Sequence, residues 1–284
     1  MNTRLAAVEV RDLTFTYVGS LKPSISDLNF SIDKGQFVVL TGPSGCGKTS
    51  VCRCLNGLIP HFYSGELQGD VVVCGLSIRE KPTSELSRKV GFVFQNPENQ
   101  LFSLSVERDI AFGPENLGLP RAETRERVEW ALEATGISSL RYRAPYELSG
   151  GQQQRAAISA VLAMKPEVMV LDEPTSFLDP KSAVEILKVV HDLNKRLGIT
   201  IVLVEHRLDL ASQYADRVLI MDKGKMILDG EPSDVYDERS RLIGVGIPRI
   251  TFLAQLLQKD GFPFSKIPLT VEEASAALRR TLRP

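Results

Sequence analysis

The segment "GPSGCGKT", at residues 42–49, contains the residues most clearly suited to chemistry. It fits the pattern G-x-x-x-x-G-K-[ST] and lies between a short apolar run and a segment with a helical pattern. In such a loop the glycines let backbone N–H groups turn inward around a phosphate, and the lysine reaches the β- and γ-phosphates. The segment therefore predicts a triphosphate site, with Lys48 on phosphate and the Thr49 hydroxyl on Mg²⁺.

Two carboxylates follow an apolar strand-like run. Asp172 and Glu173 end the segment "EVMVLDE". A phosphate-binding loop needs a carboxylate at the end of a nearby strand to hold Mg²⁺ through water, and Asp172 supplies it. Glu173, the next residue, can orient and deprotonate an attacking water molecule. The pair therefore predicts hydrolysis of the bound triphosphate, with Glu173 as the general base.

Two polar side chains end other strand-like runs. Gln95 closes "KVGFVFQ" and His206 closes "ITIVLVEH". Because open α/β sheets bind ligands at the carboxyl ends of their strands, we expect both side chains to converge with Asp172 and Glu173 on the γ-phosphate. Tyr17 ends an early strand-like run, "LTFTY", and its aromatic ring either stacks on adenine or belongs to the core.

The segment "LSGGQQQR", at residues 148–155, is a second candidate for binding an anion. Ser149 would cap the helix that follows, and two glycines let a ligand approach the backbone at the positive end of that helix. The segment contains no acid, base or metal ligand among its glutamines. Its residues could contact a phosphate, but they carry no catalytic group of their own.

The elements that must position these residues alternate between strand and helix patterns. "EVMVLDE" and "ITIVLVEH" are apolar runs of the kind that a buried parallel sheet needs, and a helix pattern at 180–198 joins them. The pattern is mainly helical over about residues 97–164, and its clearest helix, at 121–136, ends at Gly136. The sequence therefore predicts an α/β core that is split by a helical insertion.

A hairpin pattern at 217–230 precedes a tail with two further helix patterns. The first, "PRITFLAQLLQKDG", is amphipathic. The second, "LTVEEASAALRRTL", has Thr270 and Glu273 at the spacing of a capping box. The tail is too short to be an independent enzyme domain, so we expect a nucleotide-binding domain at 1–235 and a small C-terminal extension at 236–284.

Composition excludes several classes of protein. With 43% hydrophobic and 24% charged residues, the chain has the composition of an ordinary soluble globular protein. Its net charge of −1 argues against a nucleic-acid partner. No apolar run approaches the roughly 18 residues of a membrane-spanning helix, and "MNTRLAAVEV" lacks the apolar core of a signal peptide. We therefore expect the chain to meet any membrane through a partner.

The four cysteines, Cys46, Cys52, Cys54 and Cys74, match no zinc-binding pattern, because no histidine lies near enough in sequence to complete one. Cys52 and Cys54 are two positions apart on a predicted helix and so lie on different faces of it. We expect the four residues to be buried, reduced thiols, which fits a cytosolic protein.

In their order along the chain, the phosphate-binding loop, Gln95, "LSGGQ", "VMVLDEP", "SFLDP" and His206 closely resemble the motifs of ATP-binding cassette (ABC) ATPases. The resemblance covers about residues 5–235, and "LSGGQ", the family's signature, makes it very specific. It implies an α/β fold: a RecA-like P-loop NTPase core with an antiparallel β subdomain, a helical insertion subdomain and a short C-terminal helical extension. Phe177 departs from the family, which more often has a small residue before Leu-Asp, but it keeps the spacing to Asp179.

The resemblance implies a role for each matching residue. Glu173 would be the general base, His206 would contact the γ-phosphate, and Gln95 would sense Mg²⁺ and the transmembrane partner. The implied Mg²⁺ site consists of Thr49, Gln95 and Asp172. The implied ATP-binding residues are Tyr17, which would stack on adenine, and Gly42, Ser44, Gly45, Cys46, Gly47, Lys48, Thr49, Ser50, Ser149, Gly150, Gly151, Gln152 and Asp179.

The resemblance also explains the second anion-binding helix start. In this family two cassettes pack head to tail, and the signature of each caps the γ-phosphate of the ATP held by the other. Ser149 and Gly151 would then form one half of a site, and Asp179 would bridge the dimer. We therefore expect the chain to work with a second ABC ATPase subunit, either as a homodimer or as a heterodimer with a paralogue. The glutamines and Arg155 are assigned only to helix packing and signal relay.

The segment 91–119, "GFVFQNPENQLFSLSVERDIAFGPENLGL", is similar to the ATPases of energy-coupling factor transporters, the importers of vitamins and of cobalt or nickel. "VEHRLD" and "IPLTVEEA" match as well. This similarity implies an integral membrane coupling subunit, a separate substrate-binding membrane subunit and a place at the cytoplasmic face of the membrane. Because most of this segment directly follows Gln95, it should form the groove that grips a helix of the membrane partner.

Two other functions remain open from the sequence. One is the ATPase of a conventional ABC importer of sugars or amino acids, although such sugar importers often carry a long regulatory domain. The other is a soluble ABC ATPase in DNA repair or translation. Repair members carry long coiled coils before the signature, and the segment between Gln95 and Ser149 is too short for one. Translation members carry two cassettes, whereas one phosphate-binding loop is visible here.

Overall fold

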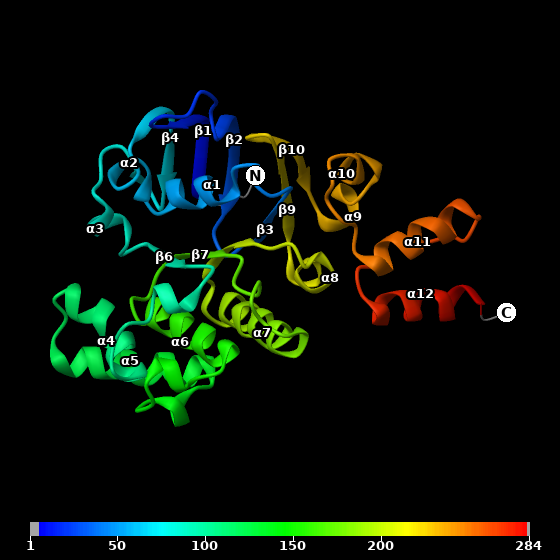
Figure 1. Ribbon diagram of the computed structural model, residues 1–284. Coiled ribbons are helices and arrows are strands. Elements are labelled where there is room, and N and C mark those ends of the chain that lie inside the picture. The colour runs from blue at the N-terminus through cyan, green and yellow to red at the C-terminus, as the bar shows by residue number, and fades with distance from the viewer. Residues whose placement is uncertain (1–5, 283–284) are drawn as a thin grey trace.

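A six-stranded sheet forms the centre of the molecule in the computed structural model, which describes residues 6–282 (Figure 1). The strands lie in the order β10-β9-β3-β8-β7-β6. They are β3 (Phe37–Thr41), β6 (Val90–Val93), β7 (Val168–Asp172), β8 (Thr200–Val204), β9 (Arg217–Asp222) and β10 (Lys225–Gly230). Neighbouring strands are parallel, except that β9 and β10 pair as an antiparallel hairpin. The predicted hairpin at 217–230 is thereby confirmed.

The three middle strands of this sheet are completely buried. Every residue of β3, β7 and β8 is buried. Helices cover both faces of a parallel sheet, so its central strands must be apolar on both sides, and their sequences read as continuous apolar runs for this reason. The α/β core that the sequence predicts is confirmed.

A second, antiparallel sheet lies at the upper left of Figure 1, in the order β2-β1-β4-β5. Its strands are β1 (Ala6–Tyr17), β2 (Ile25–Asp33), β4 (Gly65–Val73) and β5 (Leu76–Ser77). Helix α1 (Lys48–Leu55) packs between the two sheets, because Val51, Cys52 and Leu55 share one buried cluster with side chains from both. Two single-turn helices, α2 (Leu58–His61) and α3 (Thr83–Leu86), border this region. The antiparallel β subdomain is therefore present as expected.

The cysteines follow the sequence-based expectation with one exception. All four thiols are free, and Cys46, Cys52 and Cys54 are buried. The expectation is wrong for Cys74, which is only partly buried. Cys74 lies in the tight turn after β4 with a φ angle of +51°, at the surface edge of the antiparallel sheet. No group of three or more potential metal-binding side chains occurs within residues 6–282.

Helices between β6 and β7 form the lower part of the molecule in Figure 1. They are η1 (Pro97–Asn99), α4 (Val106–Asn116), α5 (Arg121–Thr135), η2 (Ser138–Leu140), η3 (Pro145–Glu147) and α6 (Gly150–Leu162). Helix α5 ends at Gly136, whose φ angle of +70° is the left-handed conformation that favours glycine at a helix end. The predicted helical insertion is thus observed in the segment where the sequence places it.

The helices after β7 lead to the C-terminal end. They are α7 (Pro180–Leu197), α8 (Leu208–Ala211), η4 (Ser212–Tyr214), α9 (Pro232–Val235), α10 (Glu238–Leu242), α11 (Arg249–Lys259) and α12 (Val271–Leu282). Helices α11 and α12 lie to one side of the core in Figure 1. The hydroxyl of the buried Tyr236 shares a hydrogen bond of 2.6 Å with Ser212 Oγ and so anchors this tail to the core. The domain limits 1–235 and 236–284 stay predictions.

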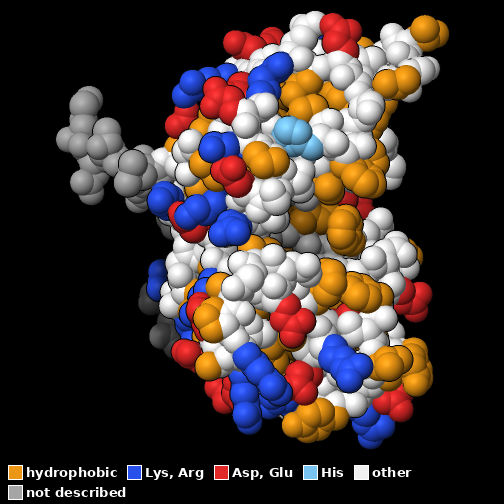
Figure 2. All heavy atoms as spheres, turned by 90° about the vertical axis from the view of Figure 1, so that its left-hand side faces the viewer, with side chains coloured by type: hydrophobic (Ala, Val, Ile, Leu, Met, Phe, Trp, Pro, Cys, Tyr) orange, Lys and Arg blue, Asp and Glu red, His pale blue; other side chains and the backbone are white. Residues whose placement is uncertain are grey.

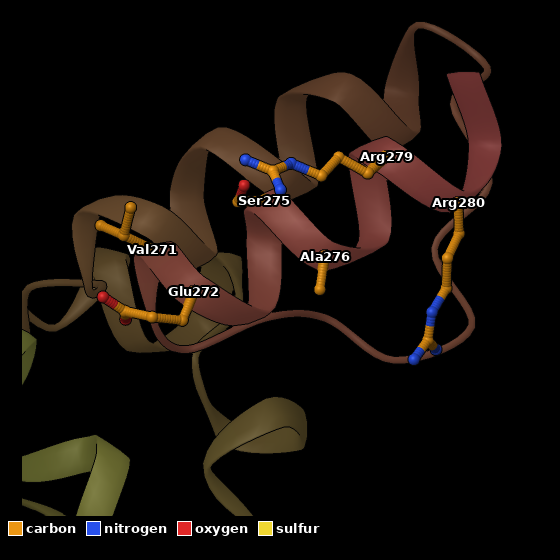
Figure 3. Close-up of a pocket in the computed structure, with 6 residues that line it drawn as sticks. All are labelled: Val271, Glu272, Ser275, Ala276, Arg279 and Arg280. Atoms are coloured by element: carbon orange, nitrogen blue, oxygen red, sulfur yellow. The ribbon is translucent and has the colours of Figure 1, made fainter. Parts of the chain in front are cut away.

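Helix α12 has half of the predicted capping box: Thr270 Oγ1 accepts a hydrogen bond of 3.2 Å from the Glu273 N–H, whereas Glu273 Oε2 accepts from the Leu269 N–H at 2.8 Å. Figure 3 shows its outer surface, where Glu272 lies near one end and Arg279 and Arg280 lie near the other. These side chains line a shallow cavity of about 450 Å³. None of the helices in residues 6–282 combines the length and the apolarity needed to cross a bilayer.

Candidate functional site

The phosphate-binding loop connects β3 to α1 and depends on glycine at two positions. Gly42 and Gly47 have φ angles of +150° and +108°. A Cβ atom would lie 2.1 Å from the Met221 carbonyl oxygen at Gly42 and 2.4 Å from the Ser24 carbonyl oxygen at Gly47. The loop therefore runs so close to neighbouring backbone that only glycine fits, as a loop that folds its N–H groups around phosphate requires.

Lys48 lies inside this loop. Its side chain is 4% exposed, and Nζ donates hydrogen bonds to the carbonyl oxygens of Gly42 at 2.9 Å and Pro43 at 3.0 Å. The ammonium group also lies 3.9 Å from the Cys46 sulfur. Burial raises the pKa of the Cys46 thiol, and the charge of Lys48 partly offsets that effect. A buried ammonium group held by neutral carbonyls is well placed to donate to phosphate oxygens, which bind it more strongly.

Two oxygen ligands suited to Mg²⁺ lie together at the start of α1 and the end of β7. Thr49 Oγ1 donates to Asp172 Oδ1 at 3.4 Å. Asp172 is 7% exposed; burial raises the pKa of its carboxyl group, and the hydrogen bond from Thr49 lowers it to a smaller extent. Hydroxyl and carboxylate oxygens are the ligands that Mg²⁺ prefers. The third predicted ligand, Gln95, contacts Glu173 instead of these two residues.

Glu173 is the centre of a hydrogen-bonded cluster. Gln95 Nε2 donates to Oε2 at 2.9 Å, and Ser176 Oγ donates to the same oxygen at 3.0 Å. His206 Nε2 lies 3.0 Å from Oε1, and because a carboxylate only accepts, Nε2 carries the hydrogen of this pair. The φ angle of Glu173 is +48°, a conformation that is uncommon outside glycine and that occurs often at functional sites.

Strand register explains why these residues meet. Val93 of β6 pairs with Leu171 of β7, and Asp172 of β7 pairs with Val204 of β8, so the three strands end at one edge of the sheet. The expectation that Gln95 and His206 close their strands is slightly wrong, because each lies two residues beyond the last strand residue. Leaving the sheet frees both side chains to turn towards Glu173. Ser176 was not among the predicted site residues, although its position three residues after Glu173 is visible in the sequence.

Tyr17 ends β1 and lies against α1. Its hydroxyl shares a hydrogen bond of 3.0 Å with Ser50 Oγ and accepts one of 3.2 Å from Arg53 Nη1. Tyr17 is partly buried, and its ring meets the buried Phe15 ring edge to face at 4.7 Å. The structure therefore places Tyr17 next to the phosphate-binding helix, although the sequence left open whether it belongs to the core.

The signature segment begins α6 with a reciprocal cap. The Gln152 N–H donates to Ser149 Oγ at 3.4 Å, and the Ser149 N–H donates to Gln152 Oε1 at 3.0 Å. Ser149 and Gly150 are exposed, while Gly151 faces Ser182 of α7 and would bring a Cβ to 3.1 Å from it. Within residues 6–282, no hydrogen bond joins this segment to the phosphate-binding loop. The start of α6 is therefore exposed and stands apart from the phosphate-binding loop of its own chain.

The remaining residues of "LSGGQQQR" connect α6 to its surroundings. Gln153 Nε2 donates to the Pro145 carbonyl oxygen at 3.1 Å, and Arg155 forms an ion pair with Glu185 of α7 at 2.6 Å. Gln154 is 1% exposed and borders a cavity of about 510 Å³ between α6 and the loop after Gln95; its Nε2 has no hydrogen-bond partner in residues 6–282. This segment thus helps to hold α6 against α7.

Asp179 caps α7. Its Oδ1 accepts hydrogen bonds from the N–H groups of Lys181 at 3.0 Å and Ser182 at 3.1 Å. Ser182 Oγ donates to Oδ2 at 2.5 Å, and this hydrogen bond lowers the pKa of the Asp179 carboxyl group. Asp179 and the neighbouring Phe177 are exposed. A bridging role for Asp179 between two subunits stays a prediction.

Apolar side chains are exposed next to Gln95 and in the segment that follows it. Phe94, Phe102, Leu104 and Phe112 are 39%, 67%, 75% and 49% exposed. The Phe102 and Phe112 rings meet edge to face at 4.9 Å. Asp109, which is 4% exposed, accepts the Phe102 N–H at 3.1 Å and thereby holds the loop that carries that ring. Figure 2 shows exposed hydrophobic side chains on this side of the molecule, including a group near the junction of its upper and lower parts.

The fold and the site together define a P-loop nucleoside triphosphatase, with a phosphate-binding loop after β3 and two carboxylates at the end of β7. The family model described as "ABC transporter" matches residues 25–176, more than half of the chain. The chain therefore belongs to the ABC transporter family as an ATP-binding protein, and it is an ATPase.

Relatives at high identity cover nearly the whole chain. An ABC transporter ATP-binding protein of Pyrococcus horikoshii is 46% identical over 274 residues, which are 96% of both proteins. The energy-coupling factor transporter ATP-binding protein EcfA2 of Clostridium tetani is 42% identical over 282 residues, again 96% of both. Some relatives are much longer, and the chain spans 48% of an ABC transporter ATP-binding protein of Methanosarcina mazei that is 44% identical.

Solved structures agree with this assignment. CbiO1 from Clostridium perfringens, part of the ABC transporter complex cbiONQ, has a TM-score of 0.75 at 34% identity and covers 89% of this chain and 99% of its own. The ATP-binding cassette MJ0796, solved as a dimer in a post-hydrolysis state with ADP and Pi, has a TM-score of 0.68 at 27% identity. That alignment covers 79% of this chain and 98% of MJ0796.

Proposed function

We propose that this chain is the ATP-hydrolysing subunit of an energy-coupling factor importer. ATP binding closes a head-to-tail dimer of cassettes, hydrolysis reopens it, and the motion drives membrane partners that take up a vitamin or a transition metal ion. The observation that carries the proposal is the segment 91–119, which contains Gln95 and exposes the aromatic pair Phe102 and Phe112. The similarity to EcfA2 and to cbiO1 supports it.

The phosphates of ATP would bind at the loop between β3 and α1. Lys48 exchanges the carbonyl oxygens of Gly42 and Pro43 for phosphate oxygens, because a hydrogen bond between two charged groups is stronger than one to a neutral carbonyl. Mg²⁺, when bound by Thr49 and Asp172, neutralises phosphate charge. The close pair of hard oxygen ligands supports this part of the proposal.

Hydrolysis would then depend on Glu173. Its carboxylate accepts a proton from the water that attacks the γ-phosphorus, while the bond to the leaving ADP oxygen breaks. The products are ADP, inorganic phosphate and a proton. His206 and Gln95 hold the two oxygens of Glu173 in place, and Gln95 could give up its hydrogen bond to help hold Mg²⁺ when the ion is bound. With ATP bound, His206 and Ser176 would still fix the carboxylate, which therefore needs little reorganisation before it accepts the proton.

A second cassette, either a copy of this chain or a paralogue, would complete each site. Its Ser149 and Gly151 reach the γ-phosphate held by the loop of the first, while the exposed Asp179 bridges the two. The exposed start of α6 supports this arrangement, as does the dimer in which MJ0796 was solved. The membrane partners would be a coupling subunit and a substrate-binding subunit, with the ATPase at the cytoplasmic face of the membrane and no nucleic acid involved.

The proposed partners can be tested by purifying the membrane complex from the native organism through a tagged copy of this chain. We expect a coupling subunit and a small integral substrate-binding subunit to co-purify. The variant Phe102→Asp should lose both, because it places a charge among exposed apolar side chains, whereas Leu242→Asp, at an even more exposed apolar residue on α10, should retain them. A soluble binding protein in place of the membrane substrate subunit would instead indicate a conventional importer.

A further inference from the structure

Arg53 contacts two aromatic rings and has no assigned role in ATP hydrolysis. It lies in the last turn of α1, partly buried. Nη1 donates to the Tyr17 hydroxyl at 3.2 Å, and the guanidinium carbon lies 4.2 Å from the centre of the Tyr63 ring, within the range of a cation–π contact. Arg53 forms no ion pair within residues 6–282. A partly buried guanidinium that uses aromatic partners in place of a carboxylate is positioned by those rings.

Tyr17 is held on several sides by this cluster. Its hydroxyl shares a hydrogen bond of 3.0 Å with Ser50, two residues after Lys48. Its ring meets Tyr63 edge to face with ring centres 6.4 Å apart, and it meets Phe15 in the same way at 4.7 Å. Tyr17 is the last residue of β1, and the residues that follow it are exposed. The strand alone therefore does not fix the direction of this ring, whereas the cluster does.

We propose that Arg53 is a positioning residue for the adenine base: it holds the Tyr17 ring in the orientation that stacks on the base, and Tyr63 holds Arg53 in turn. The inference rests on the proposed contact between Tyr17 and adenine. Fixing an aromatic ring before the ligand arrives removes part of the entropy cost of binding, so the effect should be seen in ATP affinity and not in the chemical step. Neither Arg53 nor Tyr63 needs to touch the nucleotide.

A rival explanation is that Arg53 acts on the phosphate end of the site through its charge. Arg53 lies near enough to Asp172 to lower the pKa of that carboxyl group, although burial raises it by more. A charge that acts there would affect every ligand that carries phosphates, with or without a base. Inorganic tripolyphosphate, which has the phosphates and no base, therefore separates the two explanations.

The test compares the ATPase activity of the full chain with the variant Arg53→Met, which keeps a long side chain but removes the charge and the donor. The KM for ATP should rise about three- to tenfold, with kcat within about twofold, as expected for the loss of one hydrogen bond and one cation–π contact. The inhibition constant of tripolyphosphate should not change. Arg53→Lys, which keeps a cation and a donor, should have a KM nearer to that of the unmodified protein.

A double-mutant cycle with Tyr17→Ala tests whether Arg53 acts through Tyr17. In the Tyr17→Ala background, Arg53→Met should change the KM for ATP by less than about twofold. Independent, multiplying effects would overturn the inference, as would a parallel rise in the tripolyphosphate inhibition constant. If Arg53→Met does not fold, Tyr63→Leu serves as a second variant with the same expected pattern. An unchanged KM for ATP in Tyr17→Ala would refute the adenine contact itself. A raised KM in Tyr17→Ala together with an unchanged KM in Arg53→Met would refute only the role of Arg53.

Discussion

Replacing Glu173 with glutamine should stop hydrolysis and leave ATP binding intact. The glutamine side chain has nearly the same shape, so one oxygen can still accept from Ser176 or from His206, which now lie 3.0 Å from Oε2 and Oε1. The carboxamide cannot take up a proton from water. Positioned general bases contribute about 10²- to 10⁴-fold to rate, so kcat should fall by at least about 100-fold.

ATP affinity should stay within about threefold of that of the unmodified protein, because the phosphate contacts come from Lys48 and the loop at 42–49 and not from Glu173. The variant should therefore accumulate with ATP bound and remain as a closed dimer. Phosphate release measures kcat, titration with ATP measures affinity, and light scattering after size-exclusion chromatography measures the dimer with and without ATP and Mg²⁺.

Two results would refute this reasoning. A kcat within about tenfold of that of the unmodified protein would show that another group removes the proton. Lost ATP binding would show that Glu173 is needed for the structure of the site. Ser176→Ala is the matched control, because it removes one donor to Oε2 and leaves the carboxylate; we expect it to lower kcat by no more than about tenfold, the value of one net hydrogen bond.

Three further predictions concern the second subunit, the loop and the tail. Mixing inactive Lys48→Ala and Ser149→Arg chains should restore about a quarter of the sites if they pair at random head to tail; no recovery after proven co-assembly contradicts the composite site. Alkylation of Cys46 should block ATP binding, and prior ATP should protect the thiol. Because burial raises the pKa of this thiol above the ordinary 9.0, alkylation should be slower than that of free cysteine below pH 9 and should accelerate as the pH rises. Unchanged ATP binding after complete modification would contradict the prediction. Tyr236→Phe should cost about 1–3 kcal/mol by leaving the buried Ser212 hydroxyl without its partner, measured as the change in unfolding free energy, and no loss would show that this anchor is dispensable.

Site residues that stand together in one short segment were predictable from the sequence. The loop at 42–49 contains its glycines, Lys48 and Thr49 in one short run, and backbone geometry alone dictates where glycine must stand. The buried strands were predictable because a parallel sheet covered on both faces needs continuous apolar runs. The meeting of Gln95 and His206 at Glu173 also followed, since parallel strands end at one edge.

Contacts between elements far apart in the chain were decided by the tertiary structure alone. Tyr17 and Arg53 are 36 positions apart, and nothing in the period of β1 or α1 indicates that the two side chains meet. Cys74 reads as a buried thiol in its apolar surroundings, yet in the turn after β4 it is only partly buried. Periodicity determines which face of an element is buried, whereas register and packing between elements decide which side chains face one another across that interface.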